Sequence, residues 1–350
     1  MTRFSEFSAL FLTLAAIYIS TLFFGCSSNP SSPSDSSSGS GGSSGTSSTW
    51  SLGGAVTGSV QNLWVDGGTL YCCTSSGVFR STDTARTWTQ VVSRTQLGVA
   101  GGFDGGVVAR GSTLYLGTSD FAFFSSNSGT SWRQIRSGLG STNYICEGIY
   151  LTGNRVFYGS NAGVGFRLNF GDTTWTRAFE TGGLHNVQAF FNHNDTLYAG
   201  YEIGMQRSFD NGTTWNLAPV TGLTSTQARN VFAFTRRGNS LYIATNAGVY
   251  ISNNGGTSWA AVNGLPKKNT PDDLEDDVHA LTTAGTSVIV GMRYEGVWRS
   301  TDGTNFTDFN QGIQGIQDTR SNVGSLATMG NVVIMATSGP NPEIWIRRVQ

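Results

Sequence analysis

The feature of this sequence that most constrains its fold is a repeat that recurs seven times between residues 50 and 350. Two adjacent apolar residues such as Leu70–Tyr71 recur at intervals of 41 to 47 residues. In the first six repeats an aromatic residue stands 18 or 19 residues after the first of the two. Each repeat contains four short β-rich runs with turn signals between them, and such a unit of about 40–50 residues is typical of a propeller blade. The spacing therefore predicts an all-β fold over residues 50–350, a seven-bladed β-propeller with four-stranded antiparallel blades. The pairs begin at Leu70, Leu114, Val156, Leu197, Leu241, Val288 and Val332.

The two ends of the repeat region predict that the ring closes on itself. In the seventh repeat Gln350 stands 18 residues after Val332, where the fourth strand would begin, so we expect this repeat to lack its fourth strand. At the other end, Trp50 follows Ser48 and Thr49, which resembles the end of the turn found in the other repeats. We therefore expect residues 50–56 to supply the fourth strand of the last blade, because this pairing removes the open edge of an incomplete ring.

A turn motif precedes the aromatic residue of each repeat. Ser208–Trp215 reads Ser-Phe-Asp-Asn-Gly-Thr-Thr-Trp, and variants of it stand in the other repeats. Asp and Asn accept hydrogen bonds from the backbone of their own turn, Gly adopts positive φ without strain, and the aromatic ring can fill the space between blades. We expect these turns to be structural and not catalytic. Their defining residues are Asp83, Trp88, Asn127, Trp132, Asp210, Trp215, Asn254, Trp259, Asp302 and Phe306.

The motif resembles the Asp-box, or BNR repeat, and the resemblance covers residues 50–350. Propellers with this motif include sialidases, xyloglucanase-type glycosidases, sortilin-like receptors and photosystem II assembly factors. A single seven-bladed ring is most similar to the assembly-factor group, since the chain has no Phe-Arg-Ile-Pro tetrapeptide of sialidases and no second ring. The resemblance implies a binding or assembly module, although a fold does not by itself define a function.

Residues 1–25 have the pattern of a secretory signal peptide, with Arg3 in a short polar start and no charge in Ser8–Phe24. Gly25–Cys26 resembles the end of a bacterial lipobox, which implies that Cys26 becomes the lipid-modified first residue of the mature protein. Ser27 in the next position implies the outer membrane. The alternative is an uncleaved anchor, because seventeen residues without charge are just enough to cross a thin bilayer.

Residues 26–49 are rich in Ser and Gly and contain almost no apolar side chain. Such a segment cannot bury enough apolar surface to offset its ordering entropy, so we expect a disordered tether. Together these segments predict an extracytoplasmic protein held at a bacterial outer membrane by a lipid.

The strand order of a blade predicts where a binding site lies. The Asp-box turns occupy one face of the ring, and the joins of variable length lie on the other, which we call the variable-loop face. Variable loops on a rigid scaffold commonly carry function. We expect this face to bind a protein or a glycan, although its Asn residues have the alternative role of closing the channel mouth between blades. The candidates are Glu147, His185, Asn186, Tyr201, Glu202, Arg229, Asn230, His279, Arg293, Tyr294, Glu295, Arg320 and Asn322.

An enzymatic alternative rests on Glu202 and Glu295, which lie in corresponding loops two blades apart. Two carboxyl groups across a channel can act as acid and base on a glycosidic bond, so the alternative function is a sialidase- or xyloglucanase-like glycoside hydrolase. Their separation cannot be derived from the sequence.

The remaining chemistry is sparse. The net charge is −1 and only 12% of residues are charged, so the chain has no basic surface for nucleic acid. Asp272–Asp277 holds five carboxylates, which can bind a hard cation but lack EF-hand spacing, and a solvated acidic loop is the alternative. We predict no metal and no cofactor, and we expect Cys72, Cys73 and Cys146 to be small buried residues.

Overall fold

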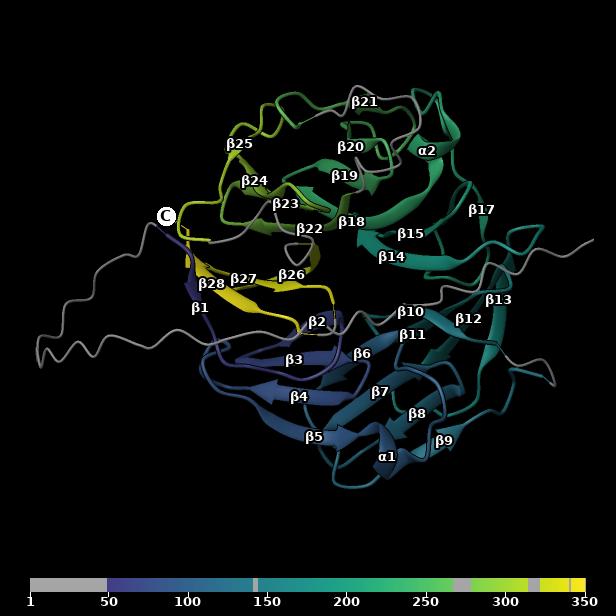
Figure 1. The fold of residues 1–350 in the computed structure, drawn as a ribbon. Coiled ribbons are helices and arrows are strands. Elements are labelled where there is room, and N and C mark those ends of the chain that lie inside the picture. The colour runs from purple at the N-terminus through teal and green to yellow at the C-terminus, as the bar shows by residue number, and fades with distance from the viewer. Residues whose placement is uncertain (1–48, 141–143, 267–277, 314–321, 340, 350) are drawn as a thin grey trace, which may run out of the picture. The chain divides into compact units, whose positions relative to one another are not determined.

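The computed structural model describes residues 49–140, 144–266, 278–313, 322–339 and 341–349. Within these ranges the chain forms seven separate four-stranded sheets, in which every paired strand is antiparallel (Figure 1). We number these sheets as blades 1 to 7 in chain order. The predicted seven-bladed β-propeller is therefore confirmed. The predictions for residues 1–25, Cys26, the tether up to residue 48 and Asp272–Asp277 lie outside the described residues.

Each blade has the same strand order from the centre of the ring outwards. The innermost strands are β2 (Val60–Asp66), β6 (Gly106–Arg110), β10 (Cys146–Thr152), β14 (Val187–His193), β18 (Val231–Arg237), β22 (Val278–Ala284) and β26 (Val323–Met329). The second strands contain the two adjacent apolar residues of each repeat. They are β3 (Thr69–Thr74), β7 (Thr113–Thr118), β11 (Arg155–Ser160), β15 (Thr196–Tyr201), β19 (Ser240–Thr245), β23 (Ser287–Met292) and β27 (Val332–Thr337).

The two outer strands of each blade flank the turn motif. The third strands are β4 (Gly77–Ser81), β8 (Phe121–Ser125), β12 (Val164–Asn169), β16 (Gly204–Ser208), β20 (Gly248–Ser252), β24 (Gly296–Ser300) and β28 (Ile344–Arg348). The outermost strands are β5 (Thr89–Ser93), β9 (Arg133–Ile135), β13 (Thr176–Glu180), β17 (Asn216–Leu217), β21 (Ala260–Ala261), β25 (Thr307–Asp308) and β1 (Ser51–Leu52). Two single-turn helices, α1 (Arg94–Leu97) and α2 (Thr226–Arg229), lie in joins between blades. In the described part of the chain, no helix has the length and apolarity needed to cross a membrane.

The ring closes as the sequence predicts. Strand β1 pairs with β28 and completes blade 7, with Ser51 opposite Ile346 and Leu52 opposite Trp345. Figure 1 shows the first strands of the chain beside the last ones. The preceding Trp50 is buried, and its indole N–H donates to the carbonyl of Phe309 at 2.6 Å.

The core consists of seven apolar clusters, one between each pair of neighbouring blades. Each cluster includes, or packs against, the aromatic residue at the end of a turn motif, and Trp50 takes this place between blades 6 and 7. The join from the preceding blade contacts some of these aromatics closely. Gly222 has a φ of +92°, and a Cβ there would come within 1.9 Å of the Trp259 carbonyl oxygen. Because the core lies between blades, no blade can bury its apolar surface alone.

The turn motifs form a repeated hydrogen-bond pattern. In blade 4, the Ser208 hydroxyl donates to Asp210 Oδ1 at 2.8 Å and accepts from the Gly212 N–H at 2.9 Å. Asp210 also accepts from the backbone N–H and the hydroxyl of Thr214. In blade 1, hydrogen bonds from Thr87 are the main reason why the pKa of Asp83 falls to about 2. Asn127, Asn254 and Asp302 accept corresponding bonds.

The three described cysteines, Cys72, Cys73 and Cys146, are free and buried, which confirms the prediction for them. Burial raises the pKa of each thiol, so all three are held in the neutral form.

Candidate functional site

A cavity opens at the centre of the variable-loop face. It has a volume of about 650 Å³, and a second cavity of about 210 Å³ adjoins it and shares seven lining residues with it. Every blade contributes a residue from the start of its innermost strand or, in blade 2, from the loop before it. The seven are Gln61, Asp104, Glu147, Gln188, Phe232, His279 and Gly324.

A β-bulge explains why these residues line the cavity. In blade 4, Val187 lies opposite Tyr201 and Ala189 opposite Gly200, so Gln188 between them has no partner in the ladder. The same shift falls at the corresponding residue in blades 1, 3, 5, 6 and 7. A bulge bends its strand locally and redirects a side chain. Blade 2 differs, because β6 begins later and Asp104 lies in the preceding loop.

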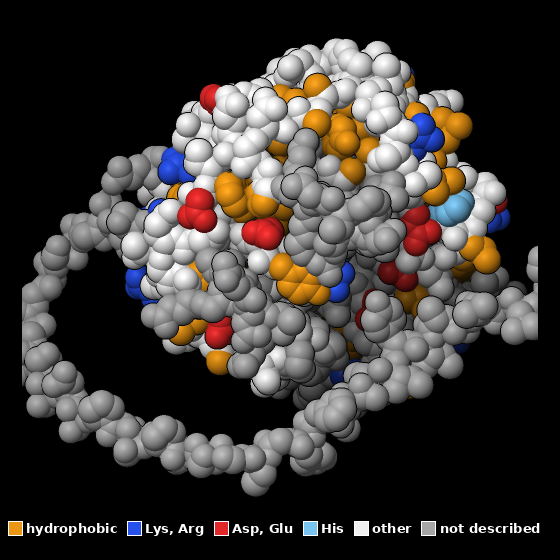
Figure 2. Space-filling model, turned by 45° about the horizontal axis from the view of Figure 1, so that its top comes forward, with side chains coloured by type: hydrophobic (Ala, Val, Ile, Leu, Met, Phe, Trp, Pro, Cys, Tyr) orange, Lys and Arg blue, Asp and Glu red, His pale blue; other side chains and the backbone are white. Residues whose placement is uncertain are grey.

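Blades 2 and 3 supply an acidic side of the cavity. Burial raises the pKa of Asp104 and is also the largest cause of the rise for Glu147, whose pKa reaches about 7. The negative charges of Asp104 and Glu202 raise the Glu147 pKa further. Figure 2 shows acidic side chains gathered beside a recess, with a histidine near them.

Blades 5 and 6 supply the other side of the cavity, which is aromatic and carries an arginine. The rings of Phe232 and His279 stack with centroids 4.5 Å apart and planes 20° apart. Arg293 lines the mouth, and its guanidinium lies 5.1 Å from the centre of the Tyr294 ring. Tyr294 has a φ of +67°, and its N–H donates to the side chain of Asn322 in blade 7 at 3.2 Å. The cavity is thus acidic on one side and aromatic and cationic on the other.

A second group of side chains lies where blades 3 and 4 meet. His185 Nδ1 lies 3.5 Å from Glu202 Oε2, and the His185 ring stacks on Tyr201 with centroids 6.4 Å apart. Leu184 precedes His185 in the chain and is 81% exposed, and Ile203 follows Glu202 and is 49% exposed. We call Leu184 and Ile203 the apolar pair.

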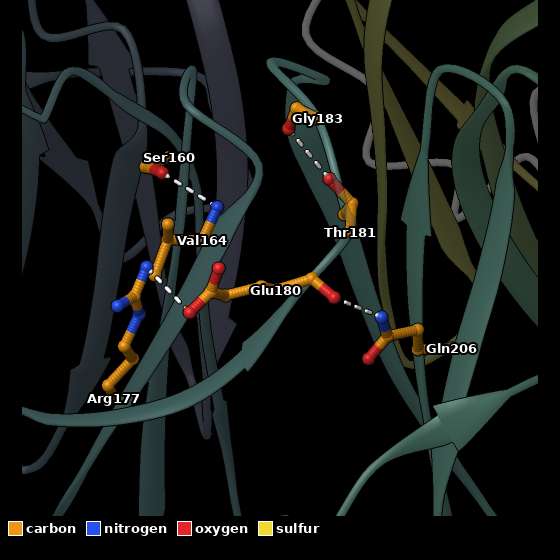
Figure 3. Close-up of polar contacts among 7 residues, drawn as sticks. All are labelled: Ser160, Val164, Arg177, Glu180, Thr181, Gly183 and Gln206. Carbon is orange, nitrogen blue, oxygen red and sulfur yellow. Dashed lines mark hydrogen bonds and ion pairs between the residues drawn. The ribbon is translucent and has the colours of Figure 1, made fainter.

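The join that carries Leu184 and His185 is tied to both blades (Figure 3). The side-chain amide of Gln206 in blade 4 donates to the carbonyl of Glu180 at 2.7 Å. The Thr181 hydroxyl donates to the Gly183 carbonyl at 3.0 Å, and the Thr181 N–H donates to the Gly163 carbonyl at 2.8 Å. These bonds hold the loop in one conformation and leave Leu184 exposed to solvent.

The remaining predicted residues mostly join neighbouring elements. Gln188 donates to Asn230 Oδ1 at 2.8 Å, which links blades 4 and 5. The Arg229 side chain donates to the Leu223 carbonyl at 3.1 Å, and Asn186 is half-buried before Val187. Arg320 lies outside the described residues.

The two glutamates of the enzymatic alternative have different contacts. The Glu202 carboxylate lies against His185, and the backbone carbonyl of Glu295 accepts from the side chains of Trp298 and Asn310. The negative charges of Asp104 and Glu202 raise the pKa of a third carboxyl group, that of Glu147. Among the described residues, no group of three or more His, Cys, Asp or Glu side chains is placed to hold a metal ion.

Sequence reasoning missed Asp104, Gln61, Gln188 and Phe232 as cavity residues. It selected the Asn residues that precede the first Val of an innermost strand, of which Asn322 lines the cavity, whereas most blades line it with the second residue of that strand. In an alignment of the seven repeats, this position is polar or aromatic in most blades although it lies inside a strand. That contrast was the available signal.

Comparisons with known proteins bear on the fold. No protein-family model and no curated protein sequence matches the chain. The structure of YCF48 bound to D1 peptide is similar, with a TM-score of 0.63 at 13% identity over 86% of this chain and 97% of that one. A domain described as the extracellular domain of a hybrid two component system from B. thetaiotaomicron has a TM-score of 0.62 at 12% identity, over 83% of this chain and 40% of that one.

An enzyme shares the fold as well. The GH74 enzyme of Niastella koreensis has a TM-score of 0.57 at 16% identity, over 83% of this chain and 43% of that one. The chain therefore spans less than half the length of this enzyme and of that extracellular domain. At such identities the likeness establishes a seven-bladed β-propeller and does not extend to activity.

Proposed function

We propose that this protein is an extracytoplasmic binding or assembly scaffold that recognises a segment of another protein on its variable-loop face. The observation that carries the proposal is the apolar pair. Leu184 and Ile203 are exposed although each adjoins the ordered His185–Glu202 contact, and the Leu184 loop is fixed by hydrogen bonds from two blades.

Exposed apolar surface rimmed by polar residues is a common mark of a protein-interaction site, and here the His185–Glu202 contact adjoins both apolar side chains. A protein segment fits better than a glycan here, because aliphatic side chains offer no hydrogen bonds to sugar hydroxyls. The likeness to YCF48, which is seen bound to a peptide, supports this choice.

The N-terminal segment supports a membrane-held form of the scaffold. We propose that Cys26 carries a lipid and that residues 26–49 tether the propeller outside the cytoplasm, on the outer membrane. The extracellular domain from B. thetaiotaomicron shows that this fold occurs outside cells. We also propose that the turns at Asp83, Asp210 and Asp302 are Asp-boxes. Mass spectrometry of the native protein tests the lipid: an intact Met1 terminus would contradict it.

The experiment on the binding face is a crosslinking capture of partners from native membranes, made with the double variant Leu184→Ser, Ile203→Ser. We expect this variant to lose the partner that the wild-type protein captures. The matched control is Leu217→Ser, since Leu217 is 71% exposed but lies on the outermost strand of the same blade. Loss of capture in the control alone, or unchanged capture in the double variant, would contradict the proposal.

One observation favours a second candidate, a glycoside hydrolase. A carboxyl group with a pKa of about 7 is suited to act as a general acid at neutral pH, and Glu147 has such a pKa beside a second carboxyl group, Asp104. This candidate predicts that the protein hydrolyses at least one aryl glycoside or polysaccharide. It also predicts that Glu147→Gln abolishes the hydrolysis and that Glu202→Gln, in the pair expected from the sequence, has a weaker effect.

A further inference from the structure

We propose that the acidic side of the central cavity binds one cationic side chain, so that the protein segment recognised on this face carries a lysine or an arginine. This inference rests on the proposed function for its choice of a protein ligand. The cation site itself is argued from the cavity.

The size of the cavity is right for such a ligand. Sites for small ligands typically measure about 300–1,000 Å³, and this cavity of about 650 Å³ falls within that range. It is open on the variable-loop face, where the apolar pair also lies. A peptide segment lying on this face can therefore extend one long side chain into the cavity.

The charge arrangement selects a cation. Asp104 and Glu147 are partly removed from water, and this burial raises the pKa of each carboxyl group. The ion pairs found among the described residues are Arg177–Glu180 and His185–Glu202, and neither reaches Asp104 or Glu147. Two neighbouring desolvated carboxyl groups without a cationic partner in the described ranges interact favourably with an incoming ammonium or guanidinium group.

The opposite wall suits the rest of the side chain. Stacked Phe232 and His279 offer ring surface against which the methylene stem of lysine or arginine can pack, and a phenyl face also attracts a cation. The site therefore fits one long side chain, whose charged end lies between blades 2 and 3.

Proton linkage gives the site a measurable signature. A bound cation stabilises the charged form of Glu147, so binding lowers the pKa of this carboxyl group from about 7 and releases a proton. Affinity should rise with pH through this range. The other charged or titratable groups around Glu147 are Asp104, Glu202, Cys146, Tyr158, His279 and Arg293, and the two carboxylates are its largest charged influences.

The test uses the full-length protein and two small probes whose amino and carboxyl ends are blocked and uncharged, Nα-acetyl-lysine methylamide and its norleucine analogue. Binding is measured by ligand-observed NMR. We expect the lysine probe to bind and the norleucine probe to bind at least about tenfold more weakly, as the loss of a charge-assisted contact implies. Glu147→Gln and Asp104→Asn should each weaken the lysine probe by a similar factor. The matched control is Glu180→Gln, the same chemical change outside the cavity, which should leave the affinity within about twofold.

A second measurement keeps the test independent of folding defects. The side-chain pKa of Glu147, followed by carboxyl ¹³C shift in the wild-type protein, should fall when the lysine probe is added. Equal binding of the two probes, an unchanged Glu147 pKa, or no detectable binding of the lysine probe would each overturn the cation site.

The outcomes separate this inference from the proposed function. If Leu184→Ser, Ile203→Ser captures its membrane partner normally while the lysine probe still depends on Glu147, the proposed binding face fails and the cation site stands. If that variant loses its partner while neither probe binds, the binding face stands and the cation site fails.

Discussion

Closure of the ring should depend on one side chain, Trp50, and the substitution Trp50→Ala tests this. Strand β1 makes only two paired positions with β28, and both of its residues are exposed. Trp50 is 3% exposed, packs edge-on against Phe309 with ring centroids 5.9 Å apart, and donates to the Phe309 carbonyl. It is therefore the main apolar anchor of the strand that completes blade 7.

The expected cost follows from these contacts. Truncating a buried Trp to Ala typically destabilises a protein by ~3–5 kcal/mol. The lost indole hydrogen bond adds little, because Arg347 also donates to the Phe309 carbonyl, at 2.7 Å, and keeps that oxygen paired. We expect Trp50→Ala to lower the free energy of unfolding by ~4 kcal/mol. Trp50→Phe keeps most of the ring and loses the hydrogen bond, so it should cost ~1–2 kcal/mol.

The assay is urea unfolding followed by far-UV circular dichroism, which does not depend on the fluorescence of the substituted residue. Leu52→Ala is the control, because Leu52 lies in the same strand but is 61% exposed, and its cost should stay within ~0.5 kcal/mol. Our reasoning would be refuted if Trp50→Ala cost no more than Leu52→Ala, since the ring would then close without the indole.

Three further predictions concern single residues. The pKa of Glu147 is raised in the folded state, so this carboxyl group binds more protons in the folded state than in the unfolded state. Folding stability should therefore fall as the pH rises from about 4.5 to about 7. In thermal melts, Glu147→Gln should flatten this pH dependence. Hydrogen bonds hold the pKa of Asp210 well below its usual range, so its contribution to folding stability is present at neutral pH and lost in acid. In urea unfolding at pH 7, Asp210→Asn should destabilise less than Asp210→Ala, because Asn keeps an acceptor oxygen. Equal effects of the two substitutions would contradict the acceptor role. Gly222→Ala should destabilise by several kcal/mol because a Cβ there meets the Trp259 carbonyl, whereas Gly238→Ala, at positive φ but in open space, should cost only ~1 kcal/mol by the same assay.

How far the sequence predicts the site depends on which residues are considered. The variable-loop face was predicted because loop length varies on one side of every repeat, and Glu147, His279 and Arg293 were among the candidates that the cavity includes. Asp104 was not predicted, because blade 2 lacks the bulge and its residue reaches the cavity from a loop. The contact between His185 and Glu202 joins two blades and has no counterpart in the repeat pattern.

The sequence by itself determined the number of blades, their strand order and the pairing that closes the ring. These properties follow from local residue patterns that occur seven times, so a weak pattern in one repeat can be identified from the others. The strand missing from the seventh repeat is matched by the extra strand that follows Trp50 at the other end of the repeat region. Only the tertiary structure decided which side chains face the cavity and what their pKa values are. A bulge of one residue reverses the direction of a side chain. The pKa of Glu147 depends on its burial and on the charges of Asp104 and Glu202, which lie 43 and 55 residues away in the chain and come near it only when blades 2 to 4 pack together.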